Sequence, residues 1–128
     1  FRFIERIPNK SILPILKKTD IYISLNRAGN LSNANLEAIA ARCCIIIPKS
    51  QKKYGIDKYT DKILSKETVC RIKSTDDVSG LIKETLNLIY NKSLIEKKKK
   101  SIEAIGRSLK NWNERIETEI KALKSIFE

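Results

Sequence analysis

The sequence predicts an α/β fold in which helices flank a parallel sheet. Short runs of β-branched and aromatic residues alternate with stretches of helical periodicity, which is the pattern of parallel-sheet proteins. The run 43–48, Cys-Cys-Ile-Ile-Ile-Pro, is apolar without alternation, as expected of a strand buried on both faces of such a sheet. A length of 128 residues fits one domain. We therefore expect a partial Rossmann-like domain over 1–128, with further helices at its C-terminal end.

The expected elements alternate along the chain. Strands are expected over 1–4, 20–25, 43–48 and 68–72, and helices over 9–18, 33–42, 74–90, 93–109 and 111–126. Asn9, Ser32 and the pair Ser74 and Asp77 are expected to cap the helices that they precede, because such side chains accept hydrogen bonds from first-turn amides. The polar segment 49–65 is expected to be irregular. Ligands of parallel sheets bind at the carboxyl ends of the strands, so a site is expected in the loops that follow them.

Two C-terminal helices have apolar stripes that are expected to pack. The stripe of the first consists of Val78, Leu81, Ile82, Leu86 and Ile89, and that of the last consists of Trp112, Ile116, Ile120, Leu123 and Ile126. For Trp112, packing is the interpretation that we prefer to a platform on which a nucleobase would stack.

The chain is strongly basic, with 26 Lys and Arg against 15 Asp and Glu and a net charge of +11. Such a surplus of positive charge indicates nucleic acid, an anionic membrane surface or a phosphorylated ligand as partner. The alternative is that the charge has no functional role and follows only from a composition rich in Lys, Ile and Asn. The run Lys97–Lys100 is either a solvated helix face or a patch for lipid headgroups. No nucleic-acid partner is expected, because the chain has no RNP, KH or zinc-finger pattern and its aromatic residues are not interleaved with the basic ones.

The residue types exclude several kinds of chemistry. The chain has no His, so catalysis by a Ser-His or Cys-His pair is excluded within it. Cys43, Cys44 and Cys70 have no CxxC spacing, so neither a disulfide framework nor a zinc site is expected. They are expected to be buried, reduced thiols of a cytosolic protein. No apolar run approaches the ~20 residues of a membrane span. The chain has no Met, and we expect it to be a piece of a longer one.

The segment 24–41 is the one that can carry chemistry. It combines the end of a strand, a loop rich in Gly and Asn, and the beginning of a helix, where loop amides and the helix dipole favour an anion such as phosphate. Glu37 lies more than one turn into the helix, from which its carboxylate can accept hydrogen bonds from sugar hydroxyls. The alternative is a capped helix with a solvated glutamate. Lys49–Lys53 follow a strand at the same edge and are a further candidate for a phosphate contact.

Several motifs, in order along the chain, resemble the retaining GT-B glycosyltransferases of family four, also called group 1. They are Arg6-Ile-Pro-Asn9 through Leu16-Lys-Lys-Thr-Asp-Ile-Tyr-Ile23, Leu36-Glu-Ala-Ile-Ala40, Ile45-Ile-Ile-Pro48, Ser74-Thr-Asp-Asp-Val78 and Trp112-Asn-Glu-Arg-Ile116. The resemblance extends over essentially the whole chain. It implies that the chain is the C-terminal half of a GT-B nucleotide-sugar-binding domain.

This resemblance also implies an activity and partners. The parent enzyme would transfer a hexose, with retention, from a nucleotide-sugar donor to a hydroxyl acceptor that is a glycan or lipid-linked. It would need no metal and no other cofactor, and an N-terminal acceptor domain of the same chain would complete the active site. The isolated fragment would be inactive. From the resemblance we expect a cytoplasmic enzyme. We further expect that the enzyme can attach peripherally to the anionic inner surface of the membrane.

The family's motif assigns roles to individual residues. Glu37 matches the second of two family glutamates, which binds the nucleotide ribose, whereas the first, which holds the donor hexose, falls on Gly29. No catalytic residue is therefore assigned. The donor sugar and phosphate are expected at Asn26, Asn30, Leu31, Ser32 and Asn33, with asparagine amides replacing the missing carboxylate. Two alternatives stay open: a non-catalytic GT-B-like partner or regulatory domain, and, less favoured, a basic nucleic-acid-binding module.

Overall fold

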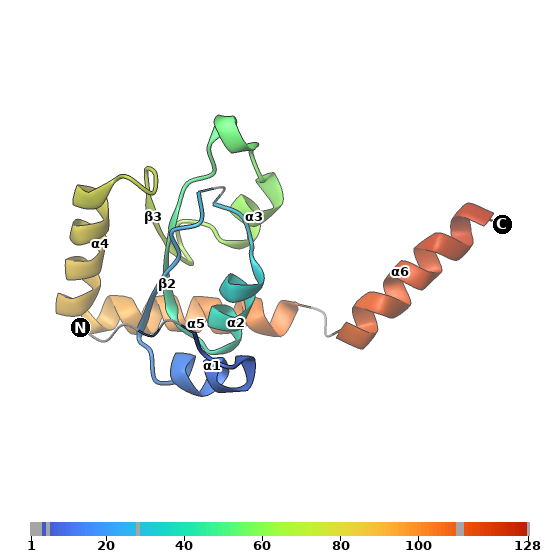
Figure 1. The fold of residues 1–128 in the computed structure, drawn as a ribbon, viewed down its shortest axis with the longest axis horizontal. Helices are drawn as coiled ribbons and strands as arrows, with labels where there is room; N and C mark the ends of the chain where they lie inside the picture. Colours follow the sequence, from blue (N-terminus) through green and yellow to red (C-terminus); the bar gives the residue numbers. More distant parts are fainter. Residues whose placement is uncertain (1–3, 5, 28, 110–111, 128) are drawn as a thin grey trace.

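The computed structural model describes residues 4, 6–27, 29–109 and 112–127. It is an α/β fold with a three-stranded parallel sheet in the order β1 (Ile21–Ile23), β2 (Cys44–Pro48) and β3 (Cys70–Ile72). The helices are α1 (Asn9–Leu16), α2 (Asn33–Ala40), the 3-10 helix η1 (Lys52–Tyr54), α3 (Lys58–Ile63), α4 (Val78–Tyr90), α5 (Lys92–Ser108) and α6 (Trp112–Phe127). The predicted fold class is thus confirmed at this level, and the small sheet is compatible with a partial Rossmann-like fold (Figure 1).

The central strand β2 organises two hydrophobic clusters on opposite faces of the sheet. All five of its residues are buried, which confirms the prediction made from its continuous apolar run. Ile45 and Ile47 belong to the cluster that includes residues of α1, α2 and α5. Cys44 and Ile46 belong to the cluster against which α4 and the beginning of α5 pack. Accordingly, α4 and α2 lie on opposite sides of the strands (Figure 1).

Helix α5 crosses the sheet at the amino ends of the strands. The buried Lys98 donates hydrogen bonds to the carbonyl oxygens of Lys66 (2.6 Å) and Val69 (3.1 Å), just before β3. Its neighbour Lys99 bonds to Asp20, just before β1. The amino ends are therefore covered by α5, and the carboxyl ends carry the loops in which a ligand site was expected.

The N-terminal prediction needs correction at the first helix. Asn9 is not a cap: it is the first helical residue, Pro8 occupies the capping position, and no side chain accepts a hydrogen bond there. Proline suits the helix border because its fixed φ is compatible with it and it has no amide to satisfy. The strand expected over 1–4 falls mostly outside the described residues, and Ile4 is not in a strand.

The segment 49–65 was wrongly predicted to be irregular. It contains η1 and α3, and α3 begins after Asp57, whose side chain accepts a hydrogen bond from the amide of Thr60. A helix of six residues is too short to show a hydrophobic period, so only the capping aspartate signalled it. At the next capping position, Asp77 rather than Ser74 caps α4, by accepting from the amide of Gly80.

Most of the apolar stripe of α4 and the described part of that of α6 are exposed, contrary to prediction; the side chain of Trp112 lies outside the described residues. On α4 only Leu88 is buried, with Leu81 packed partly against the same cluster. The rest of the predicted stripe, Val78, Ile82, Leu86 and Ile89, is exposed. A three-stranded sheet is narrow and offers surface for only one row of residues on this helix. Helix α6 extends away from the sheet (Figure 1), and its described side chains, 113–126, are all exposed. Among the described residues, no helix is both long and apolar enough to cross a membrane.

Candidate functional site

The loop after β1 folds into a compact polar turn at the carboxyl end of the sheet. The carbonyl oxygen of Asn26 accepts a hydrogen bond from the amide of Gly29 (3.0 Å). The side-chain amide of Asn26 donates to the side-chain oxygen of Asn30. The amide of Ser32 donates to the carbonyl oxygen of Asn30 (3.1 Å). The structure thus brings together Asn26 and Asn30, two of the three asparagines in the predicted site, and the third, Asn33, is the first residue of α2.

Gly29 holds this turn against the end of β2. Its φ is +62°, and a Cβ atom placed on it would lie 2.9 Å from the carbonyl oxygen of Pro48 and 3.0 Å from the amide nitrogen of Ser50. Both contacts are with backbone, which cannot move aside cheaply. A side chain of any kind therefore does not fit at position 29 in this loop conformation, and a carboxylate cannot simply be restored there.

The beginning of α2 presents free amides beside the turn. Ser32 caps the helix as predicted, with its hydroxyl oxygen 3.3 Å from the amide nitrogen of Asn35. Among the described residues, no acceptor is found for the amides of Asn33 and Ala34. First-turn amides at the positive end of the helix dipole are well suited to bind an anion.

The fully buried Asn35 joins the helix to the turn. Its side-chain amide donates to the carbonyl oxygen of Asn30 (2.9 Å), whereas its side-chain oxygen has no hydrogen-bond partner among the described residues. A buried acceptor without a donor costs free energy. The sequence did not distinguish Asn35, because it is one of four asparagines in the segment 24–41.

Thr60 of α3 braces the turn from a distant part of the chain. Its buried hydroxyl accepts a hydrogen bond from the amide of Leu31 (3.0 Å) and donates one to the carboxylate of Asp57 (2.6 Å). Hydrogen bonds from the Thr60 hydroxyl and amide lower the pKa of Asp57 below its ordinary value. Sequence analysis missed this brace, because nothing local relates residues 31 and 60.

A second brace fixes α3 to the sheet. The guanidinium of Arg71, on β3, donates to the carbonyl oxygens of Leu64 (2.7 Å) and Pro48 (3.0 Å) and lies 3.1 Å from the carboxylate of Asp61. Asp61 in turn accepts a hydrogen bond from Ser50 (2.8 Å). Burial lowers the pKa of Arg71, and the nearby Asp61 opposes that shift. This network holds the backbone of 48–50, on which Gly29 rests.

Glu37 lies apart from the polar turn, one helical turn further along α2. Its half-buried carboxylate lies close enough to Tyr22 of β1 to contribute to the raised pKa of that phenol, whose main cause is burial. Sequence analysis placed Glu37 correctly on α2 but did not anticipate its proximity to Tyr22.

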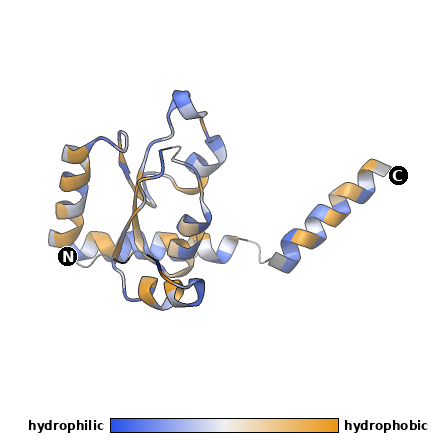
Figure 2. Ribbon diagram, viewed as in Figure 1, coloured by the Kyte–Doolittle hydropathy of each residue, from blue (hydrophilic) through white to orange (hydrophobic). Residues whose placement is uncertain are grey.

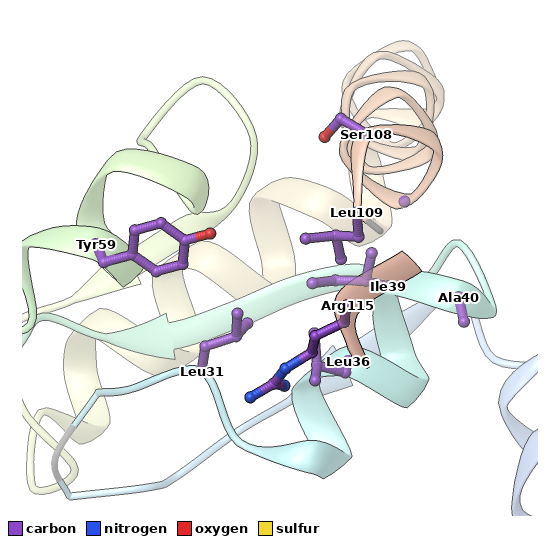
Figure 3. Close-up of a pocket in the computed structure, with 9 residues that line it drawn as sticks. Leu31, Leu36, Ile39, Ala40, Tyr59, Ser108, Leu109 and Arg115 are labelled. Atoms are coloured by element: carbon purple, nitrogen blue, oxygen red, sulfur yellow. The ribbon is translucent and has the colours of Figure 1, made fainter. Parts of the chain in front are cut away.

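An apolar hollow adjoins the turn on the α2 side (Figure 3). It has a volume of about 870 Å³, and the residues that line it include Leu31, Leu36, Ile39, Tyr59, Leu109 and Arg115. Its lining suits a ring or an aliphatic group better than a phosphate. The hollow is therefore distinct in chemistry from the polar turn and shares only Leu31 with the predicted site.

Two of the basic residues after β2 have their side chains at other features. Lys49 lines a hollow with Cys70, Arg71 and Lys98, and the ammonium of Lys53 lies over the ring of Tyr54, 5.3 Å from its centre. The phosphate contact expected within Lys49–Lys53 stays a prediction.

The cysteines are buried, as predicted, and all three are free thiols. No group of His, Cys, Asp and Glu among the described residues is arranged to hold a metal ion. Comparison of the chain with protein-family models, with curated proteins and with solved structures finds no match.

Proposed function

We propose that this chain is the nucleotide-sugar-binding part of a retaining GT-B glycosyltransferase that transfers a hexose to a hydroxyl acceptor. The observation that carries the proposal is the polar turn at the carboxyl end of a parallel sheet, next to free first-turn amides of α2. Parallel-sheet proteins bind phosphorylated ligands at such a place. The family resemblance of the segment around Leu36–Ala40 supplies the identity of the ligand.

In this proposal each part of the site has its own role. The amides of Asn33 and Ala34 bind a donor phosphate, and the side chains of Asn30 and Asn33 bind sugar hydroxyls. Glu37 accepts hydrogen bonds from the ribose. An asparagine side chain both donates and accepts hydrogen bonds, whereas a carboxylate only accepts them. This site is therefore expected to prefer a different hexose from the one preferred by a site that has the family's first glutamate.

Catalysis in such a site depends on positioning and on stabilising the leaving diphosphate. The described residues supply the positive helix end but no cation within the turn other than the exposed Arg27. The rest of the diphosphate's charge, and the acceptor, would be handled by parts of the enzyme outside this chain. The whole-enzyme activity is therefore the wider proposal, and donor binding is its local core.

The test is donor affinity, measured by calorimetry with UDP-glucose and GDP-mannose. Glu37→Gln is expected to weaken binding by about 1.5–3 kcal/mol, the value of a charge-assisted hydrogen bond. The control Glu67→Gln removes an exposed carboxylate elsewhere and is expected to have no effect. Asn30→Ala and Asn33→Ala are each measured in the same way, and at least one should reduce affinity tenfold, or about 1.4 kcal/mol. Unchanged affinity in all three variants would refute the assignment of the site.

A second candidate is favoured by one observation. Because no side chain fits at position 29, the chain cannot supply the family's hexose-holding carboxylate at its usual place. The same fold could then bind a nucleotide sugar as a partner or regulatory domain without transferring it. Donor binding without transfer to any acceptor by the complete protein would favour this candidate.

A further inference from the structure

A basic surface lies at the amino ends of the strands, opposite the candidate site. Five cationic side chains surround one hollow of about 400 Å³ there, together with three carboxylates. The amino-end surface, as we call it, consists of Lys17, Lys18, Arg42, Lys99 and Lys100, with Asp20, Glu96 and Glu103. Its cations come from three separate segments, which meet because every strand begins at this end.

Most of the negative charge on the amino-end surface is neutralised internally. Asp20 forms an ion pair with Lys99 (2.5 Å), and Glu103 pairs with both Arg42 and Arg107. In the part of the chain that the structure describes, Lys17, Lys18 and Lys100 have no carboxylate partner. The amino-end surface therefore has an excess of unpaired ammonium groups that would attract an anionic partner.

Exposed aliphatic side chains lie beside these lysines. On α1, Ile12 and Leu16 pack against the core, whereas Leu13 and Ile15 are 41% and 43% exposed. These two residues lie in the helical turn that leads directly to Lys17 and Lys18. Figure 2 shows several hydrophobic residues along α1, at the edge of the molecule.

We propose that the amino-end surface binds the surface of an anionic lipid bilayer. Lysines would contact headgroup phosphates, and Leu13 and Ile15 would enter the interface, which is how basic, partly apolar surfaces attach to membranes. A single-stranded nucleic acid fits less well, because no aromatic ring on which a base could stack lines the hollow. In this orientation the carboxyl ends of the strands, with the candidate site, face away from the bilayer.

Co-sedimentation with vesicles tests this proposal independently of donor binding. The protein is mixed with vesicles of phosphatidylcholine alone or of phosphatidylcholine with phosphatidylglycerol. Binding is expected only to the anionic vesicles and should fall with added salt. The variant Lys17→Glu/Lys18→Glu/Lys100→Glu is expected to bind about 100-fold more weakly, or about fivefold for each lysine.

A matched control separates this surface from net charge. Lys52→Glu/Lys58→Glu/Lys62→Glu changes the net charge equally, but its exposed lysines lie outside the amino-end surface, so its vesicle binding should remain within a few fold of the original. Circular dichroism confirms that both variants are folded, and Leu13→Asn, which keeps every charge, should also weaken binding. Equal loss in both triple variants, equal binding to neutral vesicles, or tighter binding to an oligoribonucleotide than to anionic vesicles would overturn the proposal.

Discussion

Replacing Gly29 with alanine is expected to destabilise the fold by about 2–5 kcal/mol. One part of this cost is conformational, because an L-residue at a φ of +62° loses about 1–2 kcal/mol. The other part is steric. The new methyl group would lie 2.9 Å from the Pro48 oxygen and 3.0 Å from the Ser50 nitrogen, and overpacking of this kind costs about 1–3 kcal/mol.

Gly55→Ala is the matched control for the Gly29 prediction. Gly55 also has a positive φ, +86°, but no atom lies within 4 Å of the position that its Cβ would occupy. The control has no steric cost, but its ψ of 144° lies close to a region that is nearly restricted to glycine, so its conformational cost of about 1–3 kcal/mol is at least that expected at Gly29. Free energies of unfolding are measured for both variants by urea denaturation followed by circular dichroism.

A loss of less than about 2 kcal/mol at Gly29 would refute the packing of the turn on β2, and Gly55→Ala shows how much a methyl group costs where only the backbone conformation opposes it. A third variant, Gly29→Asn, sharpens the test, because asparagine tolerates the left-handed region better than alanine. If the steric contact dominates, Gly29→Asn should still be clearly destabilised.

Three further predictions concern the braces of the turn. Thr60→Val keeps the side-chain shape but leaves the amide of Leu31 without its acceptor, so urea denaturation should show a loss of about 1–3 kcal/mol. Arg71→Met removes hydrogen bonds to two carbonyl oxygens and leaves Asp61 without its ion pair; a loss of about 2–4 kcal/mol is expected, and no loss would contradict the network. The pKa of Asp57 is lower in the folded chain than its ordinary value of 3.8. The ionised carboxylate therefore stabilises the fold fully above pH 3.8, and this stabilisation is lost as the pH falls through the lower, folded-state pKa. Denaturation between pH 5 and pH 2 should therefore show a weaker acid destabilisation in Asp57→Asn than in the original chain.

Local signals were sufficient to predict the main elements of the fold. The uninterrupted apolar run at 43–48 predicted a doubly buried strand, because only a parallel sheet covers both faces of a strand with helices. Ser32 predicted the beginning of α2, because a serine before a polar first turn is a local signal. Both features depend on neighbouring residues alone, which is why the sequence reveals them.

Long-range contacts account for what the sequence did not reveal. Thr60 and Leu31 are separated by 29 residues, and no periodicity relates them. The packing role of Gly29 depends on the backbone of 48–50, so the sequence showed it only as a loop glycine at the place of the family's first glutamate. The burial of the apolar stripe of α4 was wrongly predicted. The amphipathic pattern indicates that a helix has an apolar face, but it does not indicate how wide the sheet beneath that face is.

The sequence predicted only part of the geometry of the candidate site. The resemblance placed the expected site in the loop after β1 and at Glu37, and the structure brings Asn26, Gly29 and Asn30 together in one turn. Glu37 lies further along α2, near enough to Tyr22 to add to the effect of burial, which raises the pKa of that phenol. That a nucleotide-sugar donor binds at the turn and at Glu37 stays a prediction.

Amide chemical-shift mapping with a nucleotide sugar tests the donor-binding proposal most directly. Uniformly ¹⁵N-labelled protein is titrated with UDP-glucose and, separately, with GDP-mannose. The proposal predicts that at least one donor shifts the amides of Asn30, Asn33 and Ala34 most strongly, with smaller shifts near Glu37, and that the amides of α5 at the opposite end of the sheet do not respond. Shifts confined to α5 and α1, or no saturable shift with either donor, would contradict it.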